Sequence, residues 1–377
     1  TAVCPMSLSA RASVIWKLLA SPIKRTFITI LSSFWIYRRK CKLILQQNHH
    51  LFAIFLIYLP RIIIQLMDIS VIIPVFNRAK LIQRTLDSVI SQSHRPINLI
   101  LVDNNSTDDT MLVLENYKAE HEAEDFKILI TTELKVGAAA ARNCGVKLAT
   151  SEWIMFFDSD DVMDNSLISR YVQEIEQAND KLDIIMCRVD VTAEDGTTVK
   201  RPLRSGGILR EHIYHSILST QRYILKRDFF NGAGGWNENL LGWNDWELGV
   251  RLILRNPRVA SITDSILVHI YSQADSITGT NRSSKSHLWE LAIDEAEKVV
   301  RNYAPAEMQK ILTLLEFKRI TLAGLYTKEG SPKGKELFRT IYSRTRKLPH
   351  LSWAFPLIYR YVSLGGRGSA FIINILV

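Results

Sequence analysis

Residues 69–75 read Ile-Ser-Val-Ile-Ile-Pro-Val, an almost uninterrupted apolar run that is typical of a strand buried on both faces. Short β-rich runs then alternate with stretches of helical spacing. The expected strands are 97–102, 126–130 and 153–157, and the expected helices are 81–92, 108–120 and 138–149. Strands and helices that alternate at this spacing predict a mostly parallel sheet covered by helices.

Beyond about Asn165 the pattern changes. The elements expected there are a helix ending at Ala178, a strand at 183–191, and helices at 247–255, 288–303 and 306–326. We therefore expect a helical C-terminal region over residues 281–377. Its last segment, 353–377, mixes Trp, Tyr, Arg and apolar residues, a composition that suits a membrane surface.

The first 67 residues carry nine Lys or Arg and no Asp or Glu, which equals the formal net charge of +9 of the whole chain. The apolar stretch 51–66 is broken by Pro60 and Arg61 and is shorter than the ~20 residues of a membrane span. Three interpretations stay open for this basic apolar extension: an upstream segment that is not native, a membrane-surface anchor, and a weak transmembrane helix. The first is favoured, because a domain start fits Met67.

Charge and cysteine content indicate the compartment and the class of partner. The chain from Glu307 onward is also basic, so the middle must be net acidic. Basic ends around an acidic body favour an anionic membrane surface over a nucleic-acid groove. The four cysteines, Cys4, Cys41, Cys144 and Cys187, form no C-x-x-C pair and fit a reducing compartment. We therefore expect a cytoplasmic protein at the inner face of a membrane, with no nucleic-acid partner.

Three carboxylates follow an expected strand in the segment Phe156-Phe157-Asp158-Ser159-Asp160-Asp161. Acids this close repel one another and need a cation or a helix N-terminus beside them. One solution is Mg²⁺ or Mn²⁺ that completes its shell with substrate phosphates. The alternative is a helix cap, with Asp160 or Asp164 at the start of the helix after Asn165. An EF-hand does not fit, because Met163 stands where the calcium loop needs Gly.

Three further segments accompany this cluster. They are Ile72-Ile73-Pro74-Val75-Phe76-Asn77-Arg78, Leu101-Val102-Asp103-Asn104-Asn105-Ser106-Thr107-Asp108 and Gly137-Ala138-Ala139-Ala140-Ala141-Arg142-Asn143. Together the segments resemble the nucleotide-diphospho-sugar transferases of family 2, over about residues 68–276. The resemblance implies the GT-A fold, a Rossmann-like, mostly parallel sheet flanked by helices, in a domain spanning residues 68–280. It also implies sugar transfer with inversion.

The resemblance assigns the nucleotide side residue by residue. Pro74, Phe76 and Asn77 look like the segment that borders the base and the ribose. Asp103 is similar to the acid that hydrogen-bonds the base. The family usually has a second acid and a glycine after it, where this chain has Asn104 and then a second asparagine.

The diphosphate side follows in the same way. Arg142 resembles a helix-start residue near the donor, and a solvated helix arginine is the equal alternative. Asp158-Ser159-Asp160 matches the family's D-x-D element. By this resemblance Asp160 is the direct ligand of Mn²⁺ or Mg²⁺, and Asp158 lies nearer the donor sugar or the ribose. Asp161 is expected to support the site from behind.

The segments Gly234-Gly235-Trp236-Asn237-Glu238 and Gly242-Trp243-Asn244-Asp245-Trp246-Glu247 resemble the family's acceptor-side motif, in which an acid pair precedes a Trp and a helix. Asn244 replaces the first acid, and Asp245 keeps the position of the catalytic base. An inverting displacement needs a carboxylate opposite the leaving diphosphate to take the acceptor proton. The alternative is that Asn244 or Asp245 caps the helix that follows, and the two roles are compatible.

Aromatic residues and one histidine complete the candidate site. Trp236, Trp243 and Trp246 are candidates for stacking on an acceptor sugar, and we expect at least one of them to belong to the core. His269 matches the family's late histidine, which completes the metal shell or contacts the diphosphate. A structural histidine at a strand end is the equal alternative.

These residues predict a metal-dependent inverting glycosyltransferase. It moves a sugar from a nucleotide diphosphate donor, a UDP-sugar, to a glycan or lipid-linked acceptor in polysaccharide or glycolipid synthesis. One alternative is a sugar-nucleotide nucleotidyltransferase, which the lack of a Gly-rich basic loop after the first strand disfavours. The other is a non-catalytic glycan- or nucleotide-binding protein with a decayed site. Asn104 and Asn244 favour it, whereas Asp158, Asp160 and Asp245 oppose it.

Overall fold

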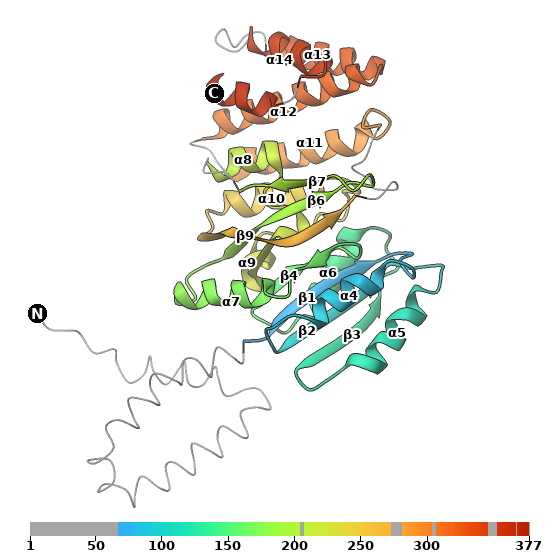
Figure 1. The fold of residues 1–377 in the computed structure, drawn as a ribbon. Helices are drawn as coiled ribbons and strands as arrows, with labels where there is room; N and C mark the ends of the chain where they lie inside the picture. Colours follow the sequence, from blue (N-terminus) through green and yellow to red (C-terminus); the bar gives the residue numbers. More distant parts are fainter. Residues whose placement is uncertain are drawn as a thin grey trace, which may run out of the picture. The chain divides into compact units, whose positions relative to one another are not determined.

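The computed structural model describes residues 67–203, 207–272, 281–303, 307–345, 353–366 and 368–376 (Figure 1). The basic apolar extension expected over residues 1–67 lies outside these ranges apart from Met67, and so do Cys4 and Cys41. Cys144 and Cys187, which are described, are free thiols.

The chain from Ile69 to Phe156 forms the alternating strands and helices that the sequence predicts. The strands are β1 (Ile69–Val75), β2 (Ile97–Asp103), β3 (Phe126–Thr132) and β4 (Trp153–Phe156), and the helices are α4 (Ile82–Ile90), α5 (Thr110–His121) and α6 (Ala138–Leu148). The four strands pair in parallel in the order β3-β2-β1-β4. In this register Ile69 lies opposite both Ile97 and Trp153.

Later strands extend the same sheet. They are β5 (Val162–Met163), β6 (Ile184–Thr192), β7 (Thr198–Arg201), β8 (Tyr223–Lys226) and β9 (Val259–Tyr271). The order continues β4-β8-β6-β9-β5, with β7 paired to β6. Strand β8 is antiparallel to both β4 and β6, and β9 is parallel to β6, so β6 and β9 run in the direction of β1. The predicted mostly parallel sheet is confirmed. The antiparallel strands β5, β7 and β8 were not predicted, because two to four residues carry too short a pattern.

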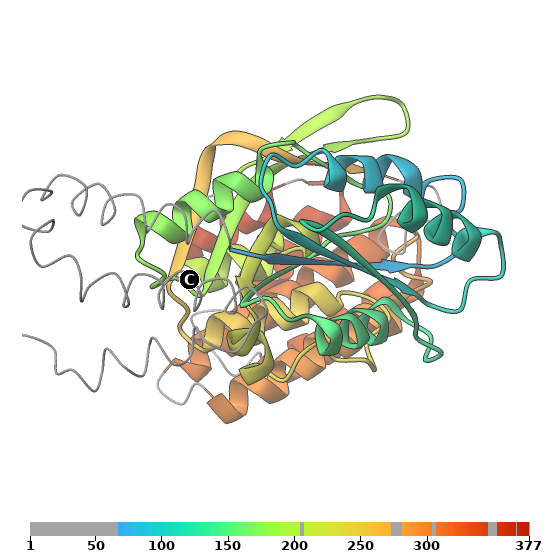
Figure 2. The ribbon, with the colours of Figure 1, turned by 90° about the horizontal axis from the view of Figure 1, so that it is seen from below.

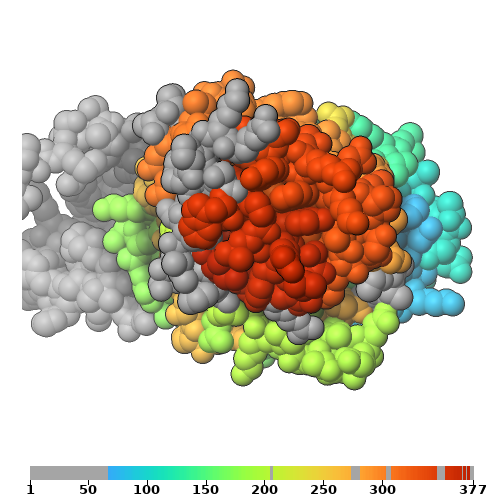
Figure 3. All heavy atoms as spheres, turned by 90° about the horizontal axis from the view of Figure 1, so that it is seen from above, coloured from blue at the N-terminus to red at the C-terminus, as the bar shows by residue number. Residues whose placement is uncertain are grey.

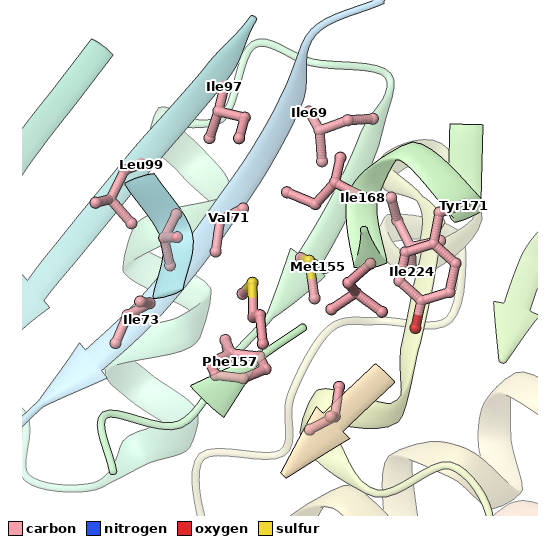
Figure 4. Packing of buried hydrophobic residues seen from close by; sticks show 14 of the residues in the cluster. Ile69, Val71, Ile73, Ile97, Leu99, Met155, Phe157, Ile168, Tyr171 and Ile224 are labelled. Carbon is pink, nitrogen blue, oxygen red and sulfur yellow. The ribbon is translucent and has the colours of Figure 1, made fainter. Parts of the chain in front are cut away.

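Strand β1 is buried on both faces, as its apolar run predicts. Ile69, Val71 and Ile73 belong to one core cluster with residues of α4, α5 and α7 (Leu167–Gln177) (Figure 4). Ile72 belongs to a second cluster with residues of α6 and α10 (Asn244–Leu254). Because successive side chains of a strand point to opposite faces, the two clusters place helices on both sides of the sheet (Figure 2).

Helix α6 approaches the sheet closely because its buried residues are small. A Cβ atom at Gly145 would lie 2.5 Å from Ile72 Cγ2, so no larger side chain fits there. Ala139 and Ala141 are buried in the same helix. This packing holds the start of α6, and with it Arg142, near the ends of β1 and β4.

The remaining helices include the C-terminal region that the sequence predicts. They are α8 (Ile208–His215), the 3₁₀ turn η1 (Thr220–Arg222), α9 (Arg227–Gly232), α11 (Ser286–Tyr303), α12 (Met308–Lys328), α13 (Pro332–Thr345), α14 (Ala354–Ser363) and α15 (Ser369–Leu376). Residues of α10, α11 and α12 share one hydrophobic cluster, so the C-terminal helices are joined to the sheet domain through α10. In the part of the chain that the structure describes, no helix has both the length and the apolarity needed to cross a bilayer.

Candidate active site

A cleft of about 930 Å³ lies at the carboxyl ends of the strands. Residues at or just after the ends of β1, β4, β6 and β9 line it, which is where open α/β sheets bind ligands. The predicted site residues among its lining are Pro74, Phe76, Arg142, Asp158, Asp160 and Asp245. The other three, Asn77, Asp103 and His269, lie outside the lining.

Asn77 and Asp103 support the loops at the cleft edge. Asn77 accepts a hydrogen bond from the Thr107 N–H through Oδ1 at 2.8 Å, and its own N–H donates to Ser106 Oγ at 2.9 Å. Asp103 is buried and accepts from the Ser106 N–H at 3.2 Å. These bonds tie the turn after β2 to the end of β1, from which the half-exposed Phe76 side chain projects. Direct contact of Asn77 and Asp103 with a nucleotide stays a prediction.

Asn104, which stands where the family usually has an acid, holds a neighbouring loop. Its Nδ2 donates to the carbonyl oxygens of Glu133 and Lys135, both at 2.8 Å, and its Oδ1 accepts from the Gly137 N–H at 2.7 Å. An ionised acid has no N–H to donate to two carbonyls. The departure from the family pattern therefore has a structural reason, since the amide fixes the loop that leads into α6.

Arg142 joins the two halves of the cleft. Its Nη2 donates to Asp158 Oδ1 at 2.7 Å, and its Nη1 lies 3.4 Å from Asn244 Oδ1. The guanidinium carbon lies 4.5 Å from the centroid of the Trp236 ring. The residue is only 5% exposed, so the alternative of a solvated helix arginine is wrong. One side chain thus connects the D-x-D element to the start of α10.

Asp160 is the second carboxylate of the D-x-D element. Its Oδ2 lies 3.7 Å from Arg78 Nη2. Burial raises the pKa of Asp160, and the negative charge of Asp158 raises it further. The expected helix cap is not found, because Ser166 is the residue at the start of α7 and no side chain caps this helix. Asp164 lies in the turn before it, where its Oδ1 accepts from the Ser166 N–H at 2.9 Å. Asp160 therefore remains available to the cleft.

The third carboxylate, Asp161, connects three segments. Its Oδ1 accepts from the Tyr271 N–H at 3.0 Å, and its Oδ2 accepts from the side-chain amide of Gln221. The residue is 2% exposed. Burial raises the pKa of Asp161 well above its ordinary value, and the charges of Asp158 and Asp160 act in the same direction. Asp161 thus fixes the D-x-D loop against the end of β9 and against η1.

Asp245 lies in the first turn of α10 and lines the cleft. Its Oδ1 accepts from the Trp246 N–H at 2.8 Å. The expected cap role is not found, because Trp243 is the residue at the helix start and no side chain caps α10. Burial raises the pKa of Asp245, while the Trp246 N–H and the charge of Arg142 partly oppose that shift. A carboxylate with a raised pKa is a stronger base than an ordinary aspartate. The helix bond engages Oδ1, and the carboxylate has a second oxygen for a proton.

Comparison of the sequence with known proteins identifies the family to which the domain around this cleft is similar. Residues 70–238 match the family model described as glycosyl transferase family 2. The chain carries a domain of this family over these residues, which are less than half of its length. The matched segment contains the D-x-D element, Arg142 and the Gly-Gly-Trp run, and it ends just before Asp245.

Curated relatives of this chain are named as glycosyltransferases, and a solved structure shares its fold. The amylovoran biosynthesis glycosyltransferase AmsB of Erwinia amylovora is 28% identical over 169 residues, which are 42% of this chain and 55% of AmsB. WfaP of Escherichia coli, a UDP-Glc:α-D-GlcNAc-diphosphoundecaprenol β-1,3-glucosyltransferase, is 36% identical over 109 residues, 29% of this chain and 41% of WfaP. The chain spans about half the length of the curated relatives it matches. S. aureus TarS 1–349 in complex with UDP-GlcNAc shares the fold with a TM-score of 0.62 at 17% identity, covering 79% of this chain and 88% of that one.

The family implies a divalent metal ion, and its fit can be tested on the side chains. Among the described residues, no group of three or more His, Cys, Asp or Glu is arranged to hold a metal. Asp158 and Asp160 are close enough for the charge of one to raise the pKa of the other, a repulsion that a cation relieves. Mg²⁺ is commonly bound through one or two carboxylates plus substrate phosphates. The two carboxylates of this family 2 domain fit such an ion and do not form an all-protein cage.

His269 does not line the cleft in which the predicted metal ligand Asp160 lies. Its Nδ1 lies 2.9 Å from Asp190 Oδ1, and the two residues pair between β9 and β6. The residue is absent from the cleft lining, although its neighbours Ile270 and Tyr271 belong to it. This geometry matches the structural alternative, and a metal role for His269 stays a prediction without support from the contacts.

The three acceptor-side tryptophans divide as expected. Trp236 and Trp246 are core residues, 2% and 0% exposed. Trp243 lines the cleft and packs against Trp246 and Trp289, with ring centroids 5.6 and 5.3 Å apart. In this glycosyltransferase domain Trp243 is therefore the candidate for contact with an acceptor sugar.

Two cations from the C-terminal region were missed by the sequence argument. Arg282 lines the cleft, and Lys318 Nζ of α12 lies 4.6 Å from the centroid of the Trp243 ring. Both lie beyond residues 70–238, where the family motifs end. Arg282 lies in the turn before α11 and Lys318 lies in α12, and neither context carries a signal that would have singled the residue out.

Proposed function

We propose that this protein transfers a sugar from a nucleoside diphosphate donor to an acceptor hydroxyl, with inversion at the sugar. The observation that carries the proposal is the convergence of Asp158, Asp160 and Asp245 on one cleft. These residues are far apart in the sequence, and Arg142 links their two sides. A decayed binding protein has no need for a partly buried carboxylate with a raised pKa on the acceptor side.

Asp245 acts as the general base in this proposal. An acceptor hydroxyl bonds to the anomeric carbon while its proton passes to Asp245, and the bond from that carbon to the diphosphate oxygen breaks. The raised pKa of Asp245 favours this proton transfer near neutral pH. Trp243, two residues earlier, offers the acceptor sugar an aromatic face at the same end of the cleft.

The donor side uses the residues at the ends of β1 and β4. Pro74 and Phe76 border the nucleotide, and Arg142 holds Asp158 in place. UDP is the proposed nucleotide, since the TarS fold was solved with UDP-GlcNAc and WfaP is named for a UDP-glucose donor. Asn77 and Asp103 shape the loops around it.

Asp160, with Asp158 beside it, would hold Mn²⁺ or Mg²⁺ against the donor diphosphate. A bound ion supplies electrostatic stabilisation of the negative charge that develops on the leaving group. Without it, the Arg78 guanidinium pairs with the Asp160 carboxylate. The carboxylate pair therefore has a charge partner both with and without the donor.

The acceptor we propose is a glycan or a lipid-linked sugar, used in polysaccharide or glycolipid synthesis. AmsB is named for amylovoran biosynthesis, and WfaP acts on an acceptor linked to diphosphoundecaprenol. Lipid-linked acceptors place the reaction at a membrane surface, which we propose to be the cytoplasmic face.

Helix α14 is the proposed point of membrane contact. Trp353, Leu357 and Leu364 are 56%, 51% and 80% exposed, and together with Tyr361 they lie on one side of the helix because they are spaced by four, four and three residues. The other side, including Phe355, packs in the core. Figure 3 shows the C-terminal helices, in red, at the surface of this part of the molecule.

The charge around α14 indicates which kind of surface binds this apolar face. Residues 337–377 contain six Lys or Arg and no Asp or Glu. A basic segment with exposed Trp, Tyr and Leu matches the interface of an anionic bilayer, where aromatic rings lie at the headgroups and each basic residue adds attraction. We therefore propose that this face docks on anionic lipid.

The function is tested by incubating the protein with a panel of sugar nucleotides, with and without Mn²⁺, and measuring release of the free nucleoside diphosphate. In the absence of an acceptor, water can take its place, and we expect one donor to be hydrolysed slowly in a metal-dependent way. A parallel incubation with nucleoside triphosphates and sugar 1-phosphates tests the alternative, because release of pyrophosphate there would instead indicate a nucleotidyltransferase.

A further inference from the structure

Each carboxylate of the D-x-D element lies against an arginine, and the two pairs differ in strength. Arg142 Nη2 donates to Asp158 Oδ1 at 2.7 Å, and the arginine side chain is only 6% exposed. Arg78 Nη2 lies 3.7 Å from Asp160 Oδ2, and these two side chains are 23% and 21% exposed. A partly exposed ion pair at this distance is weak, so Arg78 is the arginine that can leave its carboxylate.

The backbones on both sides of the Arg78–Asp160 pair are fixed by hydrogen bonds. The Arg78 N–H donates to Thr110 Oγ1 at 2.9 Å, and the Arg78 carbonyl accepts from the Ile82 N–H at 2.9 Å. The Asp160 carbonyl accepts from the Arg84 side chain. An exchange of partners at this pair therefore requires rotation of a side chain and no movement of the loops.

Two cations compete for Asp160. The carboxylate pairs with Arg78 in the structure, and it is also the proposed ligand of Mn²⁺ or Mg²⁺. A divalent ion has twice the charge of a guanidinium, and the two cations repel each other at one carboxylate. The charge of Asp158, two residues earlier, attracts the ion further. Binding of the ion therefore favours release of Arg78 from Asp160.

The position of Arg78 suits a phosphate as its second partner. Arg78 lines the cleft and lies two residues after Phe76, which is proposed to border the nucleotide. A diphosphate joins the nucleoside at that border to the ion at Asp160, so its path passes Arg78. Arginine binds phosphate through two parallel N–H donors, and such a contact is stronger than a loose ion pair.

We propose that Arg78 exchanges partners, from the Asp160 carboxylate to the donor diphosphate, when a divalent ion binds Asp160. This inference rests on the proposed transferase function and assigns a further donor-binding residue to the same site. The exchange makes binding of the ion and of the nucleotide cooperative, because the ion releases the side chain that then holds the diphosphate. By thermodynamic linkage, the nucleotide raises the affinity for the ion by the same factor.

The first measurement is a titration of the full chain with Mn²⁺ alone, followed by the electron paramagnetic resonance signal of the free ion. Arg78→Met removes the competing cation, so this variant should bind Mn²⁺ at least about threefold more tightly than the wild type, as the modest strength of a partly exposed ion pair allows. Arg78→Lys keeps a competing cation and should bind Mn²⁺ within about twofold of the wild type.

The second measurement is calorimetric titration of UDP, once with Mn²⁺ and once with EDTA. With Mn²⁺, Arg78→Met should bind UDP about tenfold more weakly than the wild type, because a charge-assisted hydrogen bond to phosphate is lost. With EDTA this loss should be smaller by at least about threefold, because Arg78 then remains with Asp160 in the wild type. Arg78→Met thus changes the affinities for Mn²⁺ and for UDP in opposite directions, which a merely structural role would not do.

The control is Lys80→Met, which removes one positive charge two residues away, at an exposed position outside the cleft lining. Both affinities of this variant should stay within about twofold of the wild type, because solvent and salt screen its charge. An equal loss of UDP affinity with Mn²⁺ and with EDTA in Arg78→Met, or unchanged Mn²⁺ binding, overturns the inference. Failure of the wild type to bind UDP would instead contradict the proposed function, so the two failures are distinguishable.

Discussion

The Arg142 guanidinium donates to Asp158 Oδ1 at 2.7 Å and reaches toward Asn244 Oδ1 at 3.4 Å, one residue before Asp245. A buried arginine therefore spans the donor and acceptor sides of a single cleft. The same contact supplies part of the positive charge that the carboxylates of the D-x-D element require. Replacement of Asn244 by the family's acid would add a second carboxylate to this arginine.

The first prediction concerns Arg142. Lysine keeps the charge but cannot reproduce the fork that reaches two partners, so Arg142→Lys should lower kcat/KM for the donor by about tenfold or more. Arg142→Met also leaves Asp158 without its partner, and we expect the free energy of unfolding to fall by about 2 kcal/mol. Donor kinetics and urea denaturation measure the two effects. Wild-type kinetics in Arg142→Lys would contradict the bridging role.

The second prediction concerns the metal. UDP should bind more tightly with Mn²⁺ than with EDTA, and Asp160→Asn should reduce that difference by on the order of tenfold. Asn is the same size as Asp but lacks the charge that attracts the ion. Calorimetric titration of UDP measures this, with Asp264→Asn, on the exposed part of β9, as the control. An unchanged metal dependence in Asp160→Asn would remove Asp160 from the metal site.

The third prediction tests whether Asp161 stabilises its loop through hydrogen bonds or through its charge. Asp161→Ala leaves the buried donors of Tyr271 and Gln221 without an acceptor, and should lower the free energy of unfolding by about 3 kcal/mol. Asp161→Asn should stay within about 1 kcal/mol of the wild type, because the Gln221 amide can turn and accept from the new NH₂ group. Thermal and urea unfolding report both. Equal loss in the two variants would show that charge, not hydrogen bonding, holds this loop.

The fourth prediction concerns membrane contact. Flotation with phosphatidylglycerol vesicles should recover the wild-type protein. A combined Trp353→Ser, Leu357→Ser and Leu364→Ser variant should bind these vesicles more weakly, by about tenfold or more. Leu112→Ser, which alters a 60% exposed leucine on α5, is the matched control. Phosphatidylcholine vesicles should bind less wild-type protein, because the electrostatic attraction is absent. If the triple variant floats normally but has a lower mass by light scattering, the face joins two copies and the membrane proposal fails.

Much of the fold could be predicted because the apolar patterns of β1, β2 and α6 are long and regular. The position of the cleft follows from the same patterns, since parallel strands direct Phe76 and Asp158 to one edge. The role of Asn104 and the bonding partners of Asp161 could not be predicted, because each depends on hydrogen bonds to segments brought near only by folding. Lys318 was missed for a similar reason: a lysine in an amphipathic helix carries no sign of the aromatic rings it will meet.

The most direct test of the central claim is the Asp245→Asn variant. Once the donor and acceptor are identified, transfer should fall by about 10²- to 10⁴-fold, as for a lost general base, while UDP affinity is unchanged. Because burial raises the pKa of Asp245, its ionised form costs stability at every pH above the ordinary aspartate pKa of about 3.9. The variant should therefore unfold at an equal or higher temperature at pH 7, and any such gain should disappear below pH ~4. Transfer at the wild-type rate by a folded Asp245→Asn protein would contradict the account.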